Sequence, residues 1–235
     1  MLALALGLML AVQQDPCPPD AMSLMAEASV RAAELDLPAA AEQLRATVAQ
    51  GCASAEVAAL YVRGLVDAHE AFRQGGSPES LVPVRHAIGA LEAIAQSRPG
   101  PAGIARLVLQ AAAAAAQSER DEMRLYLESA IRMEALQRTA SQPGAPLVTA
   151  AEVAGDLWLL VHRYEEAWQS YVAAVEQVGP ALRVLAGLAR TTARQNHVTA
   201  ACGAFRTLVE EWGVRQAEPP EISEARAYLR EAACR

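Results

Sequence analysis

A pattern at residues 164–179 recurs 34 residues later in the chain. The matched positions are Tyr164 and Val198, Ala167 and Ala201, Tyr171 and Phe205, Val175 and Val209, Glu176 and Glu210, and Gly179 and Gly213. A period of this length is typical of a repeated pair of helices, and each pair leaves an apolar face that only a neighbouring pair can cover. The sequence therefore predicts an all-α fold, an α-solenoid of antiparallel helix pairs.

Helical periodicity continues along the chain, and no run of alternating polar and apolar residues marks a strand. We expect about five helix pairs and a C-terminal capping helix. The expected elements are 21–35 with 38–50, 54–73 with 79–97, 101–117 with 119–136, 149–161 with a helix from 164, 181–195 with 198–212, and the cap at 220–233. The pair at 54–97 is longer than the period allows, which makes it a divergent repeat.

Polar residues and prolines mark several of the expected helix ends. Asp36 can cap the helix at 38–50, and Pro38 fits its first turn. Pro83 must lie in the opening turn of its helix or kink that helix. Thr149 and Glu152 have the spacing of a capping box.

Two further segments bear on the organisation of the array. Residues 137–147, which contain Ser-Gln-Pro-Gly-Ala-Pro, have the composition of a linker and form an insertion between repeats. The last helix carries a polar face that a solenoid's terminal cap requires on its outer side. The residues of that face are Glu221, Glu224, Arg226, Arg230 and Glu231.

Small and aromatic residues have a characteristic order in the clearest repeat. The first helix has a small residue and then an aromatic one a turn later, and the second opens Tyr-x-x-Ala before a further aromatic and a small residue. These positions are Gly155, Trp158, Tyr164, Ala167, Tyr171 and Ala174, with Pro180 after them. In this pattern residues 150–213 resemble two consecutive tetratricopeptide (TPR) repeats. The second repeat has Thr192 in place of Trp158 and Leu208 in place of Ala174.

The resemblance implies a TPR-like helical-repeat domain in which the first helices of successive pairs line a concave groove. It also implies that the small and aromatic residues form the repeat core: Gly155, Trp158, Tyr164, Ala167, Tyr171, Ala174, Ala201 and Phe205. Aromatic residues in such helices are more often core than contact residues, so we also expect Trp168 in the core. The family's clamp for chaperone tails uses Lys and Asn where this chain has Glu152 and Asp156. We therefore do not expect that activity.

An apolar run at residues 2–12 is followed by the polar Gln13-Gln14-Asp15-Pro16. The run is shorter than the roughly 20 residues of a transmembrane helix and has the length of a signal-peptide core. We expect a signal peptide at 1–14, no integral membrane segment in the mature chain at 15–235, and export to the periplasm or the extracellular space. A buried or frayed N-terminal helix is the alternative, since no Arg or Lys precedes the run.

Four cysteines favour export. Cys17 precedes one expected helix and Cys52 follows the next, while Cys202 lies near the start of the helix at 198–212 and Cys234 ends the helix at 220–233. In an antiparallel hairpin these ends lie side by side, so we expect the pairs Cys17–Cys52 and Cys202–Cys234. Each disulfide would contribute about 3–4 kcal/mol in the chain-entropy model. Four reduced thiols in a cytoplasmic protein are the alternative.

Charge and motifs exclude several classes of function. The net charge of −7 argues against a general nucleic-acid surface, because phosphate binding needs clustered basic charge. All 20 basic residues are arginine. His69 and Glu70 begin a metalloprotease-like pattern, but Arg73 stands where the second ligand belongs. Without a nucleophile elbow or a phosphate-binding loop, we expect no enzyme, no metal and no cofactor.

An arginine stripe is the best candidate for ligand binding. Arg183, Arg190 and Arg194 are spaced by seven and four residues, which places them on one face of the helix at 181–195. They could bind a carboxylate or a phosphate bidentately. Glu152 and Asp156 on the neighbouring first helix could instead form ion pairs with these arginines inside the solenoid. Both alternatives stay open at this point.

The leading hypothesis is a non-catalytic scaffold that binds a protein or peptide in its concave groove. The alternative is a solenoid that takes a small anionic ligand, such as a cell-envelope fragment, through the arginine stripe.

Overall fold

The computed structural model describes residues 28, 36–52, 55–139, 148–213, 219–231 and 234. These residues form ten α-helices and no strand. The helices are α2 (Leu37–Ala49), α3 (Ala55–Arg73), α4 (Val82–Ser97), α5 (Pro101–Ala116), α6 (Arg120–Thr139), α7 (Ala150–Leu160), α8 (Tyr164–Val178), α9 (Leu182–Arg194), α10 (Val198–Trp212) and α11 (Pro220–Glu231). The expected signal peptide at 1–14 and, apart from the helical Ala28, the expected helix at 21–35 lie outside the described residues.

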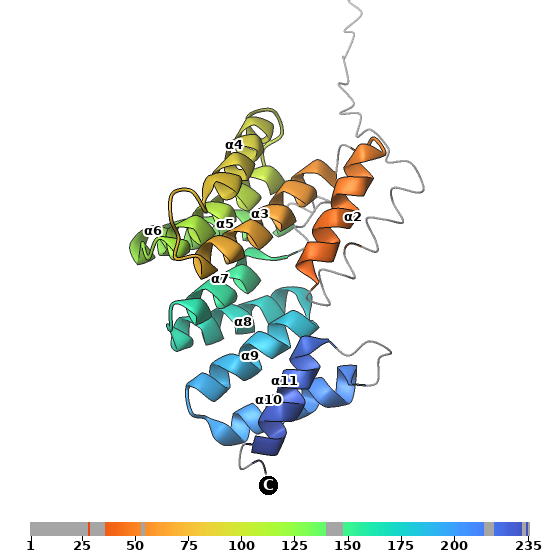
Figure 1. Ribbon diagram of the computed structural model, residues 1–235, viewed down its shortest axis with the longest axis vertical. Helices are drawn as coiled ribbons and strands as arrows, with labels where there is room; N and C mark the ends of the chain where they lie inside the picture. The colour runs from red at the N-terminus through yellow and green to blue at the C-terminus, as the bar shows by residue number, and fades with distance from the viewer. Residues whose placement is uncertain are drawn as a thin grey trace, which may run out of the picture.

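Neighbouring helices pack in pairs, and the pairs follow one another along the long axis of the molecule (Figure 1). The pairs are α3 with α4, α5 with α6, α7 with α8, and α9 with α10, and α11 packs on α10. The first helices of the pairs also contact one another in the order α3, α5, α7, α9 and form one layer. The all-α prediction is confirmed, and the stacked pairs have the arrangement expected of a solenoid.

Three of the hairpins share one turn geometry. Ser118, His162 and Asn196 each have a left-handed backbone, with φ of 64°, 61° and 60°, and each lies two residues before the next helix begins. The following residue then donates its backbone N–H to a carbonyl five residues earlier, as a Schellman-type helix end requires. These hydrogen bonds join Glu119 to Ala114 (2.9 Å), Arg163 to Trp158 (2.8 Å) and His197 to Thr192 (3.1 Å).

Capping residues fix the starts of α2 and α7. The Asp36 side chain accepts a hydrogen bond from the Ala39 backbone N–H at 3.1 Å. The Thr149 hydroxyl accepts one from the Glu152 N–H at 3.1 Å, as the capping box predicts. Pro38 lies in the first turn of α2, where its missing N–H costs nothing.

Two predicted boundaries are wrong by a few residues. Helix α4 begins at Val82, not at 79, because Ser77 to Leu81 form a turn in which the Ser77 hydroxyl accepts from the Ser80 N–H at 3.2 Å. Pro83 therefore lies in the first turn of α4. Helix α6 continues to Thr139, so the linker predicted at 137–147 cannot start before residue 140. Residues 140–147 lie outside the described residues.

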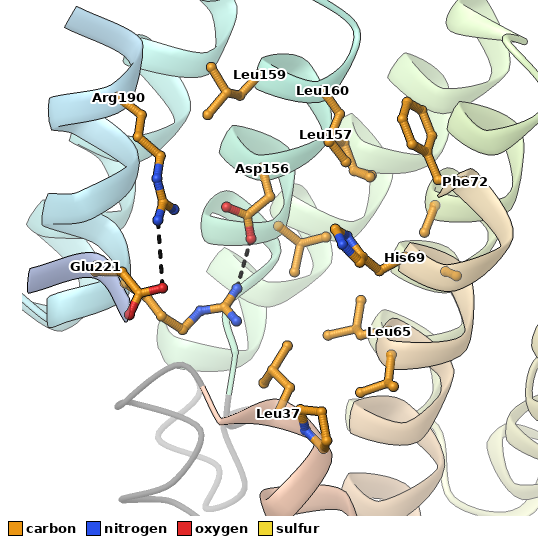
Figure 2. Close-up of a pocket in the computed structure, with 16 residues that line it drawn as sticks. Leu37, Leu65, His69, Phe72, Asp156, Leu157, Leu159, Leu160, Arg190 and Glu221 are labelled. Carbon is orange, nitrogen blue, oxygen red and sulfur yellow. Dashed lines mark hydrogen bonds and ion pairs between the residues drawn. The ribbon is translucent and has the colours of Figure 1, made fainter. Parts of the chain in front are cut away.

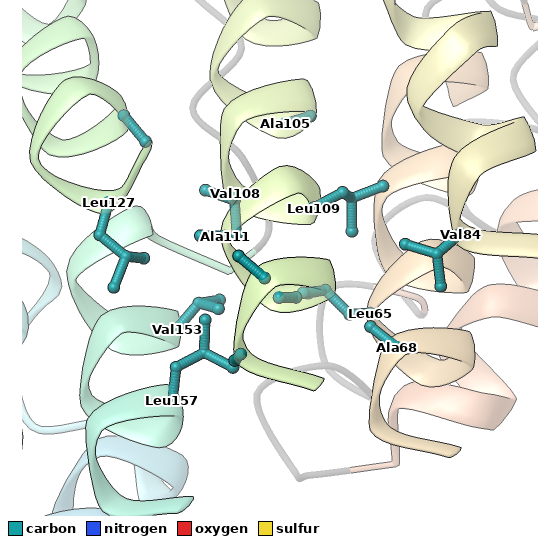
Figure 3. Close-up of a cluster of buried hydrophobic side chains, with 14 of the residues drawn as sticks. Leu65, Ala68, Val84, Ala105, Val108, Leu109, Ala111, Leu127, Val153 and Leu157 are labelled. Atoms are coloured by element: carbon teal, nitrogen blue, oxygen red, sulfur yellow. The ribbon is translucent and has the colours of Figure 1, made fainter. Parts of the chain in front are cut away.

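The largest hydrophobic cluster surrounds the alanine-rich helix α5, which is buried from both sides. Leu109 faces Leu65 and Val84 of α3 and α4, while Val108 lies on the side of Leu127 and neighbouring α7 residues (Figure 3). Alanine side chains let these helices approach closely while preserving dense packing. The low-complexity run at 111–116 is thus part of the core of the solenoid.

Tyr171 of α8 holds the next part of the stack together. Its ring lies between Gly155 of α7 and Gly187 of α9 and is 1% exposed. A Cβ added at Gly155 would stand 2.6 Å from the ring, and one at Gly187 would stand 2.2 Å from Cζ. Both glycines are therefore needed for three helices to meet at one aromatic ring.

Phe205, one period after Tyr171, packs against Tyr228 of α11 with ring centroids 4.5 Å apart.

Most residues that we assigned to the repeat core are buried. Gly155, Ala167, Tyr171, Ala174, Ala201 and Phe205 belong to this group. Trp158 and Tyr164 are only half-buried. Trp168, for which a core position was the favoured interpretation, is 41% exposed. It directly follows Ala167, so the helix turns its side chain about 100° away from the face that packs on α7.

Cys202 of α10 and Cys234 form the predicted disulfide, with 5.5 Å between their Cα atoms. Arg206 donates from Nη2 to the Cys234 carbonyl oxygen at 2.7 Å in the same place. Cys52 is buried and disulfide-bonded, but its predicted partner Cys17 lies outside the described residues, so that pairing stays a prediction. Among the helices of the described part of the chain, none has the length and apolar character needed to cross a membrane.

Candidate functional site

A cavity of about 520 Å³ opens on the layer of first helices (Figure 2). Side chains from α3, α5, α7, α9 and α11 line it, together with the first turn of α2. We call this cavity the groove. It lies on the layer that the TPR resemblance assigns to the concave face, and residues as far apart as Leu37 and Glu221 meet in it.

Most of the groove's wall is apolar. Leu65 and Phe72 come from α3, and Leu157 and Leu160 from α7; Figure 2 shows these side chains gathered with Leu37 on one side of the cavity. Phe72 and Leu160 are half-buried, so parts of their surfaces remain accessible to a ligand. Large apolar side chains on a concave surface are the usual lining of a ligand site.

The other side of the groove carries a buried ion-pair cluster. Arg183 is 7% exposed, and its Nη2 donates to Oδ2 of Asp156 at 2.7 Å while its Nε donates to Glu152. Asp156 also accepts from the Tyr171 hydroxyl at 2.6 Å. Glu152 is positioned by the capping box at the start of α7. The predicted acidic neighbours thus pair with the first arginine of the stripe, and α7 is joined to α9.

The other two arginines of the stripe have different surroundings. Arg190 donates to both carboxylate oxygens of Glu224, with Nη2–Oε2 at 2.6 Å and Nε–Oε1 at 3.1 Å. Its Nη2 also lies 3.5 Å from Oε1 of Glu221. Arg194 is exposed and forms no ion pair with any described residue. The alternative of pairing with Glu152 and Asp156 therefore applies to Arg183 and not to Arg190 or Arg194.

Burial and charge set the protonation of this cluster. Burial alone would lower the pKa of Arg183, but Asp156 and Glu152 outweigh it and raise that pKa above its ordinary value. Burial raises the pKa of the Glu152 carboxyl, and the nearby Arg183 opposes this shift. The pKa of Arg190 is likewise raised, because Glu224 and Glu221 outweigh its burial. Both guanidiniums are therefore charged under all ordinary conditions.

A second set of buried polar groups supports the start of α7. Oε2 of Glu134 in α6 accepts from the Ala150 N–H at 3.0 Å, and the Tyr61 hydroxyl of α3 donates to the Val148 carbonyl oxygen at 3.0 Å. Burial, with Glu134 nearby, raises the pKa of Tyr61 well above its ordinary value, so its hydroxyl stays a donor. These contacts fix the helix that carries Glu152 and Asp156.

Sequence reasoning missed Glu221 as a groove residue. We placed Glu221 on the outer polar face of the capping helix, but it is 8% exposed and lines the groove. The last matched position of the 34-residue pattern is Gly213, which precedes α11, and the period therefore did not predict how α11 docks. One signal for this docking was available in the sequence: Arg190 and Glu224, which form an ion pair, are 34 residues apart, which is one repeat period.

Within the part of the chain that the structure describes, no group of three His, Cys, Asp or Glu side chains could hold a metal ion. His69 lines the groove but is exposed and is not one of such a group. No protein-family model, curated protein or solved structure matches the chain.

Proposed function

We propose that this chain is a non-catalytic scaffold that binds an apolar peptide segment of a protein partner in the groove. The observation that carries the proposal is the 520 Å³ cavity, whose apolar lining is supplied by successive first helices. A site built from several stacked helices suits an extended or helical segment that contacts several repeats at once.

We also propose that the array is TPR-like. Two observations support this assignment. The first is the aromatic ring of Tyr171 packed between glycines of two successive first helices. The second is the left-handed turn residue that recurs at Ser118, His162 and Asn196, the last two separated by 34 residues. The recurring turn residue gives successive hairpins the same backbone geometry at their turns.

Export from the cytoplasm is the third part of the proposal. The Cys202–Cys234 disulfide supports it, because structural disulfides persist mainly in oxidising compartments. The apolar run at residues 2–12 would then act as the core of a signal peptide. Mass spectrometry of the mature protein would test this part directly: an N-terminus that still begins at Met1 would contradict it.

The charges near the groove favour a peptide over a small anionic ligand. Arg183 already donates to two carboxylates, and Arg190 is paired with Glu224 and Glu221. An anion would have to displace the buried Glu152 carboxylate from Arg183, which leaves that charge uncompensated and costs several kcal/mol. Of the three arginines in the stripe, Arg194 alone offers an uncommitted guanidinium to solvent.

Affinity capture with a groove variant tests the proposed function. Purified wild-type protein, Leu160→Glu and Trp168→Glu would each be used as bait, and captured proteins quantified by mass spectrometry. Leu160 lines the groove, whereas the half-exposed Trp168 of α8 does not line it and serves as the matched control. We expect a partner retained by wild type and Trp168→Glu and lost by Leu160→Glu. Equal capture by all three, with circular dichroism showing that each is folded, would rule out the groove.

A further inference from the structure

The polar side of the groove has an excess of carboxylates. Two guanidiniums, Arg183 and Arg190, face Glu152, Asp156, Glu221 and Glu224. If Glu152 is protonated, which its raised pKa favours as the pH falls, three carboxylates still face two arginines. The local charge is therefore negative in either state, and it is next to an apolar wall.

Glu221 has an unused acceptor at this place. Its side chain is 9% exposed, and Oε1 lies 3.5 Å from Nη2 of Arg190. Its other oxygen, Oε2, is buried and has no hydrogen-bond partner among the described residues. A buried carboxylate oxygen without a donor costs free energy, and a ligand that brings a donor recovers that cost.

The neighbouring carboxylates can also accept more than they now do. An ionised carboxylate has about four lone-pair sites. Each oxygen of Asp156 accepts one hydrogen bond, Oδ1 from the Tyr171 hydroxyl and Oδ2 from Arg183, and the side chain remains 42% exposed. Asp156 and Glu221 both line the groove, and each pairs with an arginine of α9, Asp156 with Arg183 and Glu221 with Arg190. A donor-rich cation placed there would meet two carboxylates.

We propose that the peptide partner carries a lysine or arginine side chain next to its apolar residues, and that Glu221 and Asp156 bind this cation while the leucines and Phe72 bind its apolar neighbours. This inference rests on the proposed function, because it names the kind of segment that the groove takes. A basic side chain also matches the protein's net charge of −7, which attracts cationic segments at long range.

Selection from a random-peptide phage library on the full, disulfide-bonded chain tests the inference. Enriched sequences would be synthesised with acetylated N-termini and amidated C-termini, so that side chains supply the only cations. We expect a consensus with a Lys or Arg within a few positions of two or more large apolar residues. Replacing that basic residue by norleucine should weaken binding at least about tenfold, as measured by fluorescence anisotropy.

The two proposals fail in different ways in this selection. If no sequence is enriched over a selection on Leu160→Glu, the proposed function fails, and this inference with it. An apolar consensus without a basic position, or one with an acidic position, leaves the proposed function standing and overturns the inference.

A Glu221→Gln variant locates the cation. The best basic peptide should bind it about tenfold more weakly, while the norleucine peptide should bind it as it binds wild type. Glu231→Gln, an exposed carboxylate on the same helix, is the matched control and should bind both peptides normally. If Glu221→Gln and Glu231→Gln weaken the basic peptide equally, the cation is not bound at Glu221. Comparing two peptides on one variant separates this loss from any change in folding.

Discussion

Successive first helices are joined differently in the two halves of the array. Helices α3 and α5 pack directly, so closely that a Cβ at Gly64 would stand 2.4 Å from a methyl carbon of Leu109. Helices α7, α9 and α11 are instead joined by Arg183 and Arg190, which form ion pairs with carboxylates on their neighbours. Direct packing closes the space between α3 and α5, whereas ion pairs hold helices together across the polar side of the groove.

The two halves contribute differently to the groove. The alanine-rich half is a packed support that adds part of the apolar wall through Leu65 and Phe72, whereas the C-terminal half supplies the polar side through its ion pairs. Buried ion pairs and a disulfide are costly or specialised ways to hold helices together. They suit a place where filling the space with leucine would remove the proposed binding site.

The largest effect is expected for Arg183→Met. This change leaves Glu152 buried without its partner, and removing one member of a buried ion pair costs about 3–5 kcal/mol. Denaturant unfolding would measure the loss. Arg106→Met in α5 is the matched control. Arg106 is half-buried and, among the described residues, its side chain bonds only to Gln110, so a loss below about 1 kcal/mol is expected. The double change Arg183→Met with Glu152→Gln should recover part of the stability, and no recovery would contradict this explanation.

Removal of the C-terminal disulfide should come next. Cys202→Ser with Cys234→Ser opens a loop with a sequence separation of 32 and should cost about 3–4 kcal/mol in the chain-entropy model. The loss should be local, because the disulfide joins the end of the chain to α10. Hydrogen exchange should accelerate in α11 and leave α5 unchanged. Equal acceleration in α5 would show that the two halves unfold as one unit.

A smaller loss is expected for Gly187→Ala. The added methyl would stand 2.2 Å from Cζ of Tyr171, so α8 and α9 must shift, at a cost of about 1–3 kcal/mol. Gly203→Ala in α10 is the matched control, because nothing lies within 4 Å of its new Cβ. That control should stabilise the protein by about 0.5–1 kcal/mol. Thermal unfolding compares the two, and a destabilised Gly203→Ala would mean that the difference is not due to Tyr171.

The smallest effect concerns pH and Glu152. Burial raises the pKa of this carboxyl above its ordinary 4.5, so the folded state binds its proton more tightly than the unfolded state does. Its contribution to stability is therefore complete below pH 4.5 and is lost as the pH rises through the raised value. The free energy of unfolding of wild type, relative to Glu152→Gln, should rise as the pH falls from 7 towards 4.5. A fall over that range would contradict the direction of the shift.

The sequence predicted the helix pairs because its period reports local features that recur. Asp36, Thr149 and Pro38 act within one turn of their helices, and their caps formed as expected. Trp168 was misplaced because an aromatic residue near Ala167 looked like part of the core, and one residue of rotation moves a side chain to another face. Local sequence patterns therefore predicted where the helices lie better than they predicted which side chains face the core.

The arginine stripe shows what spacing cannot predict. Positions separated by seven and four residues share an angle around the helix axis, but spacing does not say what lies opposite each turn. Arg183 lies in the first turn of α9 and meets α7, Arg190 lies two turns later and meets α11, and Arg194 ends the helix in solvent. The partner of each arginine depends on which neighbouring helix docks opposite that turn, which is a property of the whole stack.

Hydrogen exchange with a bound peptide tests the central claim most directly. The full chain would be compared with and without the tightest peptide from the phage selection, and amide protection measured helix by helix. Binding in the groove predicts new protection in α3, α7, α9 and α11, with α6, α8 and α10 unchanged. Protection confined to α6, α8 or α10 would place the peptide on another surface and contradict the account.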